Sequence, residues 1–267
     1  MGGKRQLIKQ FHELELFPLE KFDPLKNTYY EPFVGGGAVF FELLPKKAEL
    51  SDLNSELVTA YNVVKNKVDE LIESLNKHIY DKEYFLKVRA EDISKLSDVE
   101  IASRFIYLNR TGFNGMYRVN KKGQFNVPFG KYSNPIICDE ENLRNVSKAL
   151  KNVIIKNRDY KSVLDSAKKG DFIYFDPPYY PLNRTSSFTA YTSETFLEKE
   201  QTELRDTFVS LHKRGCYVML SNSDTPFINE LYQGIEGVMI HKVKAGRAIN
   251  SKASGRGKIT EVVVNNY

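Results

Sequence analysis

The sequence predicts an α/β fold in which helices flank a parallel sheet and a mostly helical module interrupts the sheet-forming part. Residues 29–54 read as strand, glycine turn, helix and strand; the alternation then stops, and it resumes at residue 152. Alternating strands and helices build a parallel sheet, and a block of different pattern between them indicates an insertion. We therefore expect a sheet-forming domain of residues 1–54 and 148–267, with residues 55–147 inserted.

The first predicted strand and the glycine turn after it suggest a nucleotide-like ligand. Residues 29–34 form the strand, and Gly35-Gly36-Gly37 leads into a helix over 38–44. Glycines there let a ligand approach the backbone, although the spacing is neither that of a pyrophosphate binder nor a P-loop. The second strand, 47–51, ends in Asp52, where a carboxylate can hold a ribose diol. A structural turn and an ordinary N-cap are the simpler alternatives; together the two features favour an adenosine-type ligand.

The inserted module is predicted to be mostly helical, with helices over residues 56–67, 68–78, 82–89 and 98–109. Residues 110–118 are too rich in Gly and Asn for a helix, residues 119–127 suggest a hairpin around Lys122-Gly123, and residues 128–135 are irregular. Basic and aromatic side chains alternate in the module: Arg104, Arg110, Phe113, Tyr117, Arg118, Lys121, Lys122, Phe125, Phe129, Lys131 and Tyr132. Cations for phosphates and aromatic wedges for base steps suit a nucleic-acid groove. A solvated hairpin with a few packed aromatic residues is the alternative.

The elements on either side of the module complete the predicted sheet. We expect strands over residues 152–156, 171–175, 215–220, 238–243 and 258–267, and helices over residues 162–168, 198–214 and 224–233. A polar loop over 182–195 and a basic, glycine-rich loop over 244–257 connect them. At the start of the chain, Leu7, Ile8, Phe11 and Leu14 have the spacing of a helix with one apolar face.

The strand over residues 171–175 ends in Asp176-Pro177-Pro178-Tyr179. Prolines cannot continue a hydrogen-bonded ladder, so the Asp176 and Pro177 oxygens are left to accept hydrogen bonds from a ligand beside the flat ring of Tyr179. Such acceptors suit a planar ring with an amino group, and a carboxylate stabilises positive charge that develops on nitrogen when an electrophile arrives. We predict Asp176, Pro177 and Tyr179 as catalytic residues. The electrophile that fits a glycine turn and a ribose-binding acid without a phosphate cradle is S-adenosylmethionine.

Composition excludes several other classes of protein. No stretch approaches the roughly 18 apolar residues of a membrane helix and nothing resembles a signal peptide, so we expect a cytoplasmic protein. Cys138 and Cys216 lack a metal-type spacing and the four histidines are scattered, so we expect no metal site. The formal net charge of +5 permits a polyanionic partner without requiring one.

These motifs together resemble those of the Dam-type DNA adenine-N6 methyltransferases, alpha-group amino-methyltransferases specific for GATC sites. The resemblance runs over nearly the whole chain. It is carried by Gly2-Gly3-Lys4, Glu31-Pro-Phe-Val-Gly-Gly-Gly37, Ser51-Asp-Leu-Asn54, Asn109-Arg-Thr-Gly-Phe-Asn-Gly-Met-Tyr-Arg-Val-Asn120, Gln124-Phe-Asn-Val-Pro-Phe-Gly-Lys-Tyr132, Asp176-Pro-Pro-Tyr179, Phe188-Thr-Ala-Tyr191 and Arg256-Gly-Lys258. The Asp-Pro-Pro-Tyr motif alone is moderately specific, whereas the two long motifs of the inserted module are far more so.

The resemblance implies a Rossmann-like S-adenosylmethionine-dependent methyltransferase sheet with an inserted DNA-recognition domain that carries a β-hairpin. The implied reaction is methyl transfer to the exocyclic N6 of adenine in duplex DNA, at GATC, after the base is flipped into the Asp176-Pro177-Pro178-Tyr179 pocket. The implied cofactor-binding residues are Lys4, Phe33, Gly35, Gly36, Gly37, Asp52 (on the ribose), Leu53, Asp159 (on the adenine amine), Tyr160 and Asp176. The implied DNA-binding residues are Arg110, Phe113 (a wedge), Asn114, Met116, Arg118, Pro128 and Arg184.

One departure from the family concerns the start of the chain. In the family a short segment with a lysine and an aromatic residue precedes Gly-Gly-Lys and helps to close over the cofactor and to read one base. We therefore expect weaker cofactor binding and activity for a chain that begins at Met1. The implied partners are duplex DNA containing GATC and, as a genetic rather than physical partner, a cognate restriction endonuclease; a monomer is expected, in a bacterial, archaeal or phage setting.

Two alternatives stay open at this point. The chain could be a DNA-binding homologue that has lost catalysis, although its intact Asp-Pro-Pro-Tyr segment argues against this. It could also be a methyltransferase that acts on RNA or protein, although Phe113 and Arg118 in the inserted module argue for duplex DNA.

Overall fold

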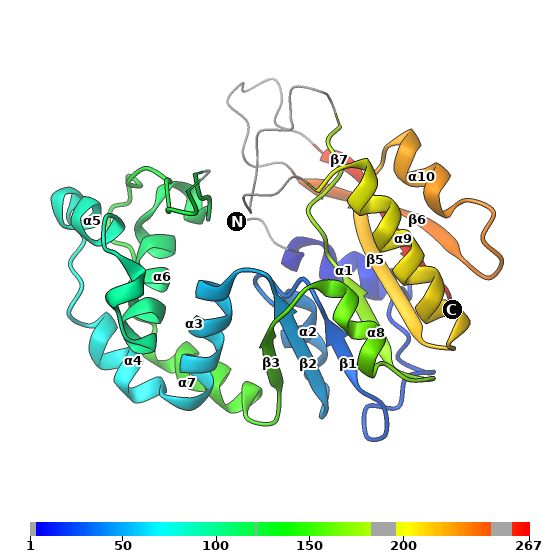
Figure 1. The fold of residues 1–267 in the computed structure, drawn as a ribbon, viewed down its shortest axis with the longest axis horizontal. Coiled ribbons are helices and arrows are strands. Elements are labelled where there is room, and N and C mark those ends of the chain that lie inside the picture. The colour runs from blue at the N-terminus through cyan, green and yellow to red at the C-terminus, as the bar shows by residue number, and fades with distance from the viewer. Residues whose placement is uncertain (1–3, 121, 183–195, 247–257) are drawn as a thin grey trace. The chain divides into compact units, whose positions relative to one another are not determined.

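A computed structural model describes residues 4–120, 122–182, 196–246 and 258–267 (Figure 1). Its sheet has the order β3-β2-β1-β4-β5-β7-β6. The strands are β1 Tyr29–Glu31, β2 Ala48–Asp52, β3 Ile154–Asn157, β4 Phe172–Phe175, β5 Tyr217–Ser223, β6 Met239–Gly246 and β7 Lys258–Asn265. The neighbours β2, β1, β4 and β5 run parallel, whereas β7 is antiparallel to both β5 and β6. The predicted α/β fold is confirmed.

The helices of the described residues are α1 Arg5–Glu13, α2 Ala38–Leu43, α3 Ser55–Asn66, α4 Val68–Leu75, α5 Lys82–Arg89, α6 Asp98–Thr111, α7 Glu140–Leu150, α8 Val163–Ser166, α9 Glu198–Lys213 and α10 Pro226–Tyr232, with short 3₁₀ turns η1 Ile93–Lys95, η2 Phe113–Gly115 and η3 Tyr160–Ser162. These residues group into two compact units. The helical unit is Asp52–Asn157; the sheet unit takes residues 4–51, 158–182, 196–246 and 258–267. Within the described ranges, no helix is both long and apolar enough to cross a membrane.

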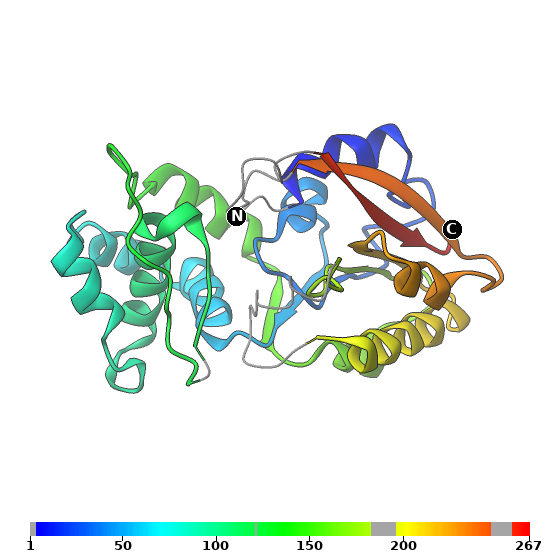
Figure 2. The same ribbon diagram turned by 90° about the horizontal axis from the view of Figure 1, so that it is seen from above.

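The core of the sheet unit forms on the two faces of β4 and its neighbours. All four residues of β4 are buried, because a central parallel strand is covered by helices on both sides. Helices α8, α9 and α10 contribute Val163, Phe208 and Ile228 to the core on one face, while α1 and α2 lie on the other (Figure 2). A sheet covered in this way leaves the strand ends as the places where polar side chains can gather.

Helix α1 is fastened to the edge strand β6, and this placement decides where Lys4 lies. Gln10 donates to the Lys244 carbonyl at 2.8 Å and accepts from the Lys244 amide at 2.9 Å. Gln6 accepts from the Gly246 amide at 3.1 Å. These side chains satisfy backbone groups that an edge strand would otherwise expose. The predicted apolar face is buried except at Leu14, which caps the C-terminus of α1 and is 49% exposed, so that part of the prediction was wrong.

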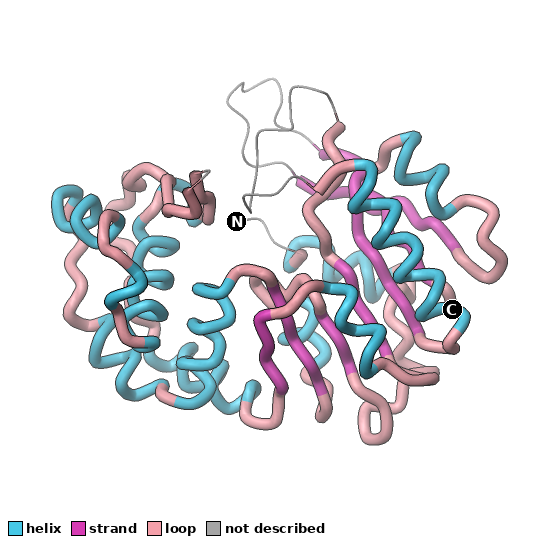
Figure 3. The backbone as a smooth tube through the Cα atoms, viewed as in Figure 1, coloured by secondary structure: helices cyan, strands magenta, loops and turns pink. Residues whose placement is uncertain are grey.

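In the helical unit, α6 packs against α3, α4 and α5, and α7 packs against α3 and α4 (Figure 3); the unit also has an apolar cluster of its own. The cluster joins α5 and α6 to the segment after them through Phe85, Tyr107, Tyr117, Phe125 and Val127. Side chains at the N-terminus of each of four helices accept hydrogen bonds from backbone amides; they are Asn54, Asp81, Ser97 and Asp139.

Several predicted boundaries in the helical unit and near β6 were wrong. Helix α7 was missed, although its Leu143 and Leu150 are buried. Helix α6 runs through Arg110, which was predicted to lie in a loop, since the Gly-rich segment begins only at Gly112. The predicted hairpin exists as a turn with a single antiparallel bridge, Val119↔Phe125, rather than as paired strands. Residues 244–246, predicted as loop, continue β6, while 247–257 lie outside the described residues.

Candidate active site and nucleic-acid interface

The glycine turn and the Asp-Pro-Pro-Tyr segment follow neighbouring strands. Strand β1 pairs with β2 on one side and with β4 on the other, with Tyr30 opposite both Glu49 and Ile173. The chain order therefore reverses at β1, which creates a switch point where open α/β sheets bind ligands beyond the carboxyl ends of their strands. In the sheet unit, both motifs lie at this end of the sheet.

A backbone hydrogen bond closes the glycine turn, and the centre of the turn, at Gly36, leaves room for a ligand. Gly35 and Gly37 have φ of 45° and 63°, values that favour glycine, and the Gly37 amide donates to the Val34 carbonyl at 2.7 Å. A Cβ added to Gly36 would meet no atom within 4 Å. Val34 also donates to the Ser51 carbonyl at 3.0 Å, which ties the turn to the end of β2. The backbone of this turn is therefore accessible to a bound molecule.

The buried side chain of Glu31 holds the glycine turn in place. It is 2% exposed, and its Oε2 accepts from the Tyr29 hydroxyl at 2.7 Å and from the Phe40 amide at 3.1 Å. These bonds fasten the end of β1 to the first residues of α2. Burial raises the pKa of Glu31 to about 8, and the negative charge of Asp176 adds to the rise. Glu31 is therefore protonated at neutral pH.

Phe33 and Tyr160 stack on each other beside this turn. Their ring centroids are 5.2 Å apart with an interplanar angle of 25°, and Phe196 packs edge-on against both. Tyr160 is buried, and burial raises the pKa of its hydroxyl. Asp159 is exposed and caps the following 3₁₀ turn by accepting from the Lys161 amide at 2.8 Å. Phe33, Asp159 and Tyr160 thus come together in the sheet unit.

Asp52 ends β2 and is assigned to the helical unit. Its side chain is largely buried, Oδ1 accepts from the Asn54 amide at 2.9 Å, and its carbonyl accepts from Asn157 Nδ2 at 2.8 Å. The N-cap of α3 is Asn54 and not Asp52, since Asn54 Oδ1 accepts from the Leu57 amide. The capping alternative for Asp52 is therefore wrong. Leu53, next to it, is 54% exposed.

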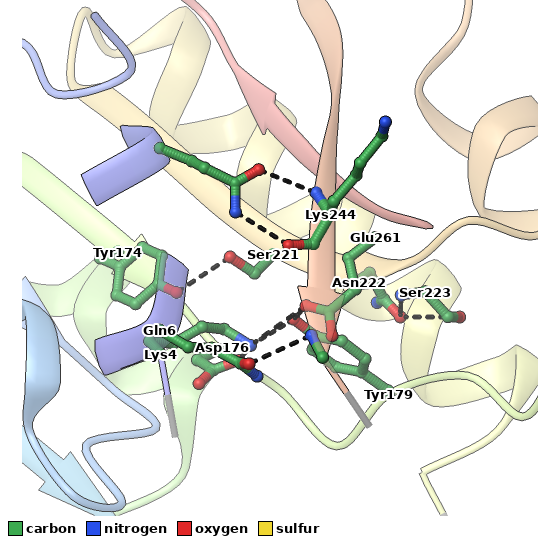
Figure 4. A network of polar contacts seen from close by, with 12 residues as sticks. Lys4, Gln6, Tyr174, Asp176, Tyr179, Ser221, Asn222, Ser223, Lys244 and Glu261 are labelled. Carbon is green, nitrogen blue, oxygen red and sulfur yellow. Dashed lines mark hydrogen bonds and ion pairs between the residues drawn. The ribbon is translucent and has the colours of Figure 1, made fainter. Parts of the chain in front are cut away.

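Asp176 lies in a compact charged cluster (Figure 4). Lys4 Nζ is 2.9 Å from Asp176 Oδ1 and 3.8 Å from Glu261 Oε2, and it donates to the Tyr179 hydroxyl. That hydroxyl in turn donates to Glu261 Oε2 at 2.8 Å. The Asp176 side chain is 28% exposed, against 12% for Lys4 and 11% for Glu261, so Asp176 is the charged group that an incoming molecule reaches.

Tyr179 is held neutral by its surroundings. Burial and the negative charges of Asp176 and Glu261 raise the pKa of Tyr179 well above its ordinary value of 10. Its hydroxyl therefore stays protonated and can donate to Glu261. The Lys4 ammonium also lies 4.2 Å from the centroid of the Tyr179 ring, within the range of a cation–π contact.

A buried chain of amides fixes the backbone after Pro177. Gln201 Nε2 donates to the Pro178 carbonyl at 2.9 Å, and Gln201 Oε1 accepts from Asn222 Nδ2 at 2.9 Å. Asn222 Oδ1 accepts from the Tyr180 amide at 3.1 Å, and Ser223 Oγ donates to the Tyr180 carbonyl at 2.7 Å. Gln201 and Asn222 are fully buried, and they supply hydrogen bonds to the Pro178 carbonyl and the Tyr180 amide, which lie beyond the end of the strand.

In the helical unit, the loop after α6 presents Phe113 and Asn114 to solvent. Phe113 is 45% exposed and its amide donates to the Pro128 carbonyl at 2.9 Å; Asn114 has φ of 54°, which Asn tolerates better than most residues. A Cβ on Gly112 would approach the Leu108 carbonyl to 2.6 Å, so the loop leaves α6 only with glycine at this position.

The other predicted DNA contacts lie around this loop. Arg110, Arg118 and Pro128 are exposed and Met116 is half-buried. Arg118 donates from Nε to Asn126 Oδ1 at 2.7 Å, so its guanidinium is held across the turn. Arg184 and Lys121 lie outside the described residues.

Arg104 was grouped wrongly with the phosphate-binding cations. Its side chain is 5% exposed, and its guanidinium contacts Glu56 Oε2 at 2.8 Å and the Val88 carbonyl at 3.0 Å. Tyr117 and Phe125 are buried in the same unit and also belong to its core. A basic or aromatic residue on the face of a helix that packs against its neighbours is part of the protein core, and composition alone does not show which face a residue is on.

Glu261, Gln201 and Asn222 were missed by the sequence analysis. Glu261 was detectable as the single acid in the apolar run 259–264, but no motif pointed to the two amides. Among the described residues, no group of three or more His, Cys, Asp or Glu could hold a metal ion.

A parallel sheet with an antiparallel penultimate strand, a glycine turn and an Asp-Pro-Pro-Tyr strand end define a methyltransferase of the α/β class. A sequence model of the D12 class N6 adenine-specific DNA methyltransferases matches residues 1–249. The chain belongs to this family and is an adenine-specific DNA methyltransferase.

Named relatives align over almost the whole chain. The Type II methyltransferase M1.LlaDCHI of Lactococcus lactis subsp. cremoris is 48% identical over all of this chain and 93% of its own length. The Type II methyltransferase M.MjaIII of Methanocaldococcus jannaschii is 46% identical over all of this chain and 96% of its own length. The DNA adenine methylase of Escherichia coli K12 is 35% identical over 98% of this chain and 91% of its own length. The predicted resemblance to Dam-type enzymes is confirmed.

Proposed function

We propose that this adenine-specific DNA methyltransferase uses S-adenosylmethionine, acts on GATC in duplex DNA, and flips the target adenine into the pocket at Asp176-Pro177-Pro178-Tyr179. The observation that supports this most directly is the position of Asp176, which follows β4 at the switch point and has a side chain that is 28% exposed. An exposed carboxylate at the end of a strand can accept a hydrogen bond from the amino group of adenine. Residues 1–54 and 148–267 are proposed as the catalytic domain and residues 55–147 as the DNA-recognition insert.

The residues at the switch point fit S-adenosylmethionine. The turn at Gly36 is open, the rings of Phe33 and Tyr160 offer an apolar wall, and no triphosphate-type loop is present in the described sheet unit. The proposed cofactor-binding residues are Lys4, Phe33, Gly35, Gly36, Gly37, Asp52, Leu53, Asp159, Tyr160 and Asp176. Asp52 would hold the ribose and Asp159 the adenine amine. When bound, the cofactor would supply an electrophilic methyl group and leave as S-adenosylhomocysteine.

Asp176 and Pro177 are proposed to prepare the target nitrogen. The lone pair of the adenine amine is delocalised into the ring; two acceptors that orient its N–H bonds favour a pyramidal nitrogen. As positive charge develops there, the Asp176 carboxylate stabilises it, most strongly where water is excluded. Tyr179 is proposed to stack on the base, an interaction worth about 1–3 kcal/mol. Gln201 holds the Pro178 carbonyl and so keeps the two acceptors in place.

The exposed loop of the helical unit is proposed to open the duplex. Phe113 would wedge between bases, and Asn114 would help to fill the space that the flipped adenine leaves. Flipping the base out of the duplex costs about a few kcal/mol. A bidentate contact of Arg118 with a guanine would contribute about 1–3 kcal/mol of discrimination. Arg110, Met116, Pro128 and Arg184 complete the proposed DNA-binding set.

The decisive experiment uses plasmid that lacks adenine methylation. After incubation with the protein and S-adenosylmethionine, we expect resistance to a GATC nuclease that methylation blocks and sensitivity to one that requires methylation. Methylation elsewhere than GATC would refute the site, and methyl incorporation into RNA or protein but not DNA would refute the substrate. A matched variant, Asp176→Ala, should bind DNA and lose methylation; retained turnover with lost binding would contradict the role of Asp176.

The biological setting is proposed from the relatives and the family. Two of them are named Type II methyltransferases, which supports a restriction-modification role with a cognate endonuclease as the genetic partner. A monomer acting on DNA in the cytoplasm of a bacterium or archaeon fits this role. Size-exclusion chromatography with light scattering tests the monomer, and a stable dimer would refute it.

A further inference from the structure

Strand β7 carries one buried acid in an apolar run. As a whole residue Glu261 is 9% exposed, and it is followed by Val262, Val263 and Val264, each of which is at most 1% exposed. It lies opposite Ser223 of β5 and Val243 of β6. Burial of a carboxylate is costly unless the group is paired. Glu261 also lies beyond residues 1–249, the part of the chain that the family's sequence model matches.

The partners of Glu261 are two residues of the proposed active site. Its Oε2 accepts from the Tyr179 hydroxyl at 2.8 Å and lies 3.8 Å from Lys4 Nζ. Lys4 Nζ is closer to Asp176 Oδ1, at 2.9 Å. One ammonium is therefore shared between two carboxylates, and only Asp176 is substantially exposed.

We infer that Glu261 is a positioning residue for methyl transfer: it holds Tyr179 and shares the Lys4 ammonium with Asp176, so that the cluster keeps one net negative charge beside the target amine. In their ordinary ionised forms, two carboxylates and one ammonium sum to −1. Without Glu261, Lys4 and Asp176 would form a neutral pair. A neutral pair stabilises a developing positive charge less than a net anion does.

The neighbouring titratable groups do not change this charge. Glu31 is protonated at neutral pH, because burial raises its pKa to about 8. Tyr174, whose hydroxyl is 2.9 Å from Ser221 Oγ, is kept neutral because burial and the charge of Asp176 raise its pKa well above 10. The inference rests on the proposed reaction, in which positive charge appears on the adenine nitrogen.

The test compares Glu261→Gln with a charge-restoring double variant. The introduced glutamine keeps an oxygen that can accept from Tyr179 but loses the charge. We expect the turnover of Glu261→Gln at saturating DNA and S-adenosylmethionine to fall at least tenfold, while the Kd for a GATC duplex changes less than twofold. Adding Lys4→Gln to this variant removes the positive charge as well and should raise the turnover again at least threefold. This turnover is measured at an S-adenosylmethionine concentration that saturates the double variant, because Lys4 is also proposed to bind the cofactor.

The controls separate charge from folding and from the proposed reaction. Glu236→Gln, an exposed acid of the same unit, should turn over at the wild-type rate. Turnover of Glu261→Gln within twofold of wild type, or no recovery in the double variant, would overturn the inference. If Glu261→Gln unfolds, Tyr179→Phe removes only the hydrogen bond between Tyr179 and Glu261. A fall in turnover of less than tenfold in this variant supports the charge argument, and a larger fall contradicts it. An inactive wild-type chain would instead refute the proposed function.

Discussion

Replacement of Glu31 by Gln should make the protein more resistant to unfolding at pH 8. Both donors to Glu31, the Tyr29 hydroxyl and the Phe40 amide, bond to the same oxygen, Oε2. The single carbonyl oxygen of a glutamine can accept both, so the substitution preserves these bonds. What it removes is the ionisable proton of a side chain that is 2% exposed.

The magnitude follows from the raised pKa of Glu31. Its pKa rises from the ordinary 4.5 to about 8, chiefly through burial. Between these values the unfolded chain has lost the proton and the folded protein keeps it, so stability falls as the pH rises. Since one pKa unit is about 1.4 kcal/mol, wild type should lose about 2 kcal/mol relative to Glu31→Gln between pH 6 and pH 8.

Urea unfolding of both proteins at pH 6 and pH 8 measures this difference, because other pH effects cancel between variant and wild type. Glu20→Gln, an exposed acid of the sheet unit, is the matched control and should show no such divergence. Equal pH dependence of wild type and Glu31→Gln would refute the buried, protonated Glu31, as would a stability gap that grows towards low pH.

Three further outcomes follow from the contacts. Arg104→Met should destabilise the protein by about 3–5 kcal/mol, because the buried Glu56 carboxylate loses its cation and keeps only its hydrogen bond from the Tyr117 hydroxyl. Thermal unfolding measures this, and an unchanged Tm would disprove the structural role of the pair. Gln201→Leu should lower turnover about tenfold (~1.4 kcal/mol) at an unchanged Kd for DNA, because the Pro178 carbonyl loses its hydrogen bond. Steady-state kinetics and a DNA-binding titration measure the two quantities, and a weaker Kd with unchanged turnover would contradict the prediction. Phe113→Ala should reduce the fluorescence rise of a duplex with 2-aminopurine at the target position, and a full rise would argue against a wedge.

Most element types were predictable because their signals are local. The apolar run before Asp176 and the two prolines after it predicted the end of a strand, and β4 ends at Phe175. Helix α5 matched its predicted bounds because its N-cap Asp81 is a local signal. Helix α7 was missed although it has the same kind of cap, Asp139, because it follows an irregular segment that masked its start.

Whether a charged residue is buried or exposed was not predictable from its type. Arg104 carries the same charge as Arg118, yet one is buried against Glu56 and the other is exposed. The difference depends on which face of α6 packs on its neighbours, and composition does not contain that information.

The sequence by itself determined the family, the strand that delivers Asp176 and the turn at Gly35-Gly36-Gly37, because each is written in consecutive residues. Only the tertiary structure decided what surrounds Asp176. Lys4 and Glu261 come from opposite ends of the chain and meet there because α1 is fastened to β6 and β7 is inserted between β5 and β6. Contacts between residues so far apart in the sequence depend on the order of the strands and on where α1 packs, and no local sequence pattern predicts either.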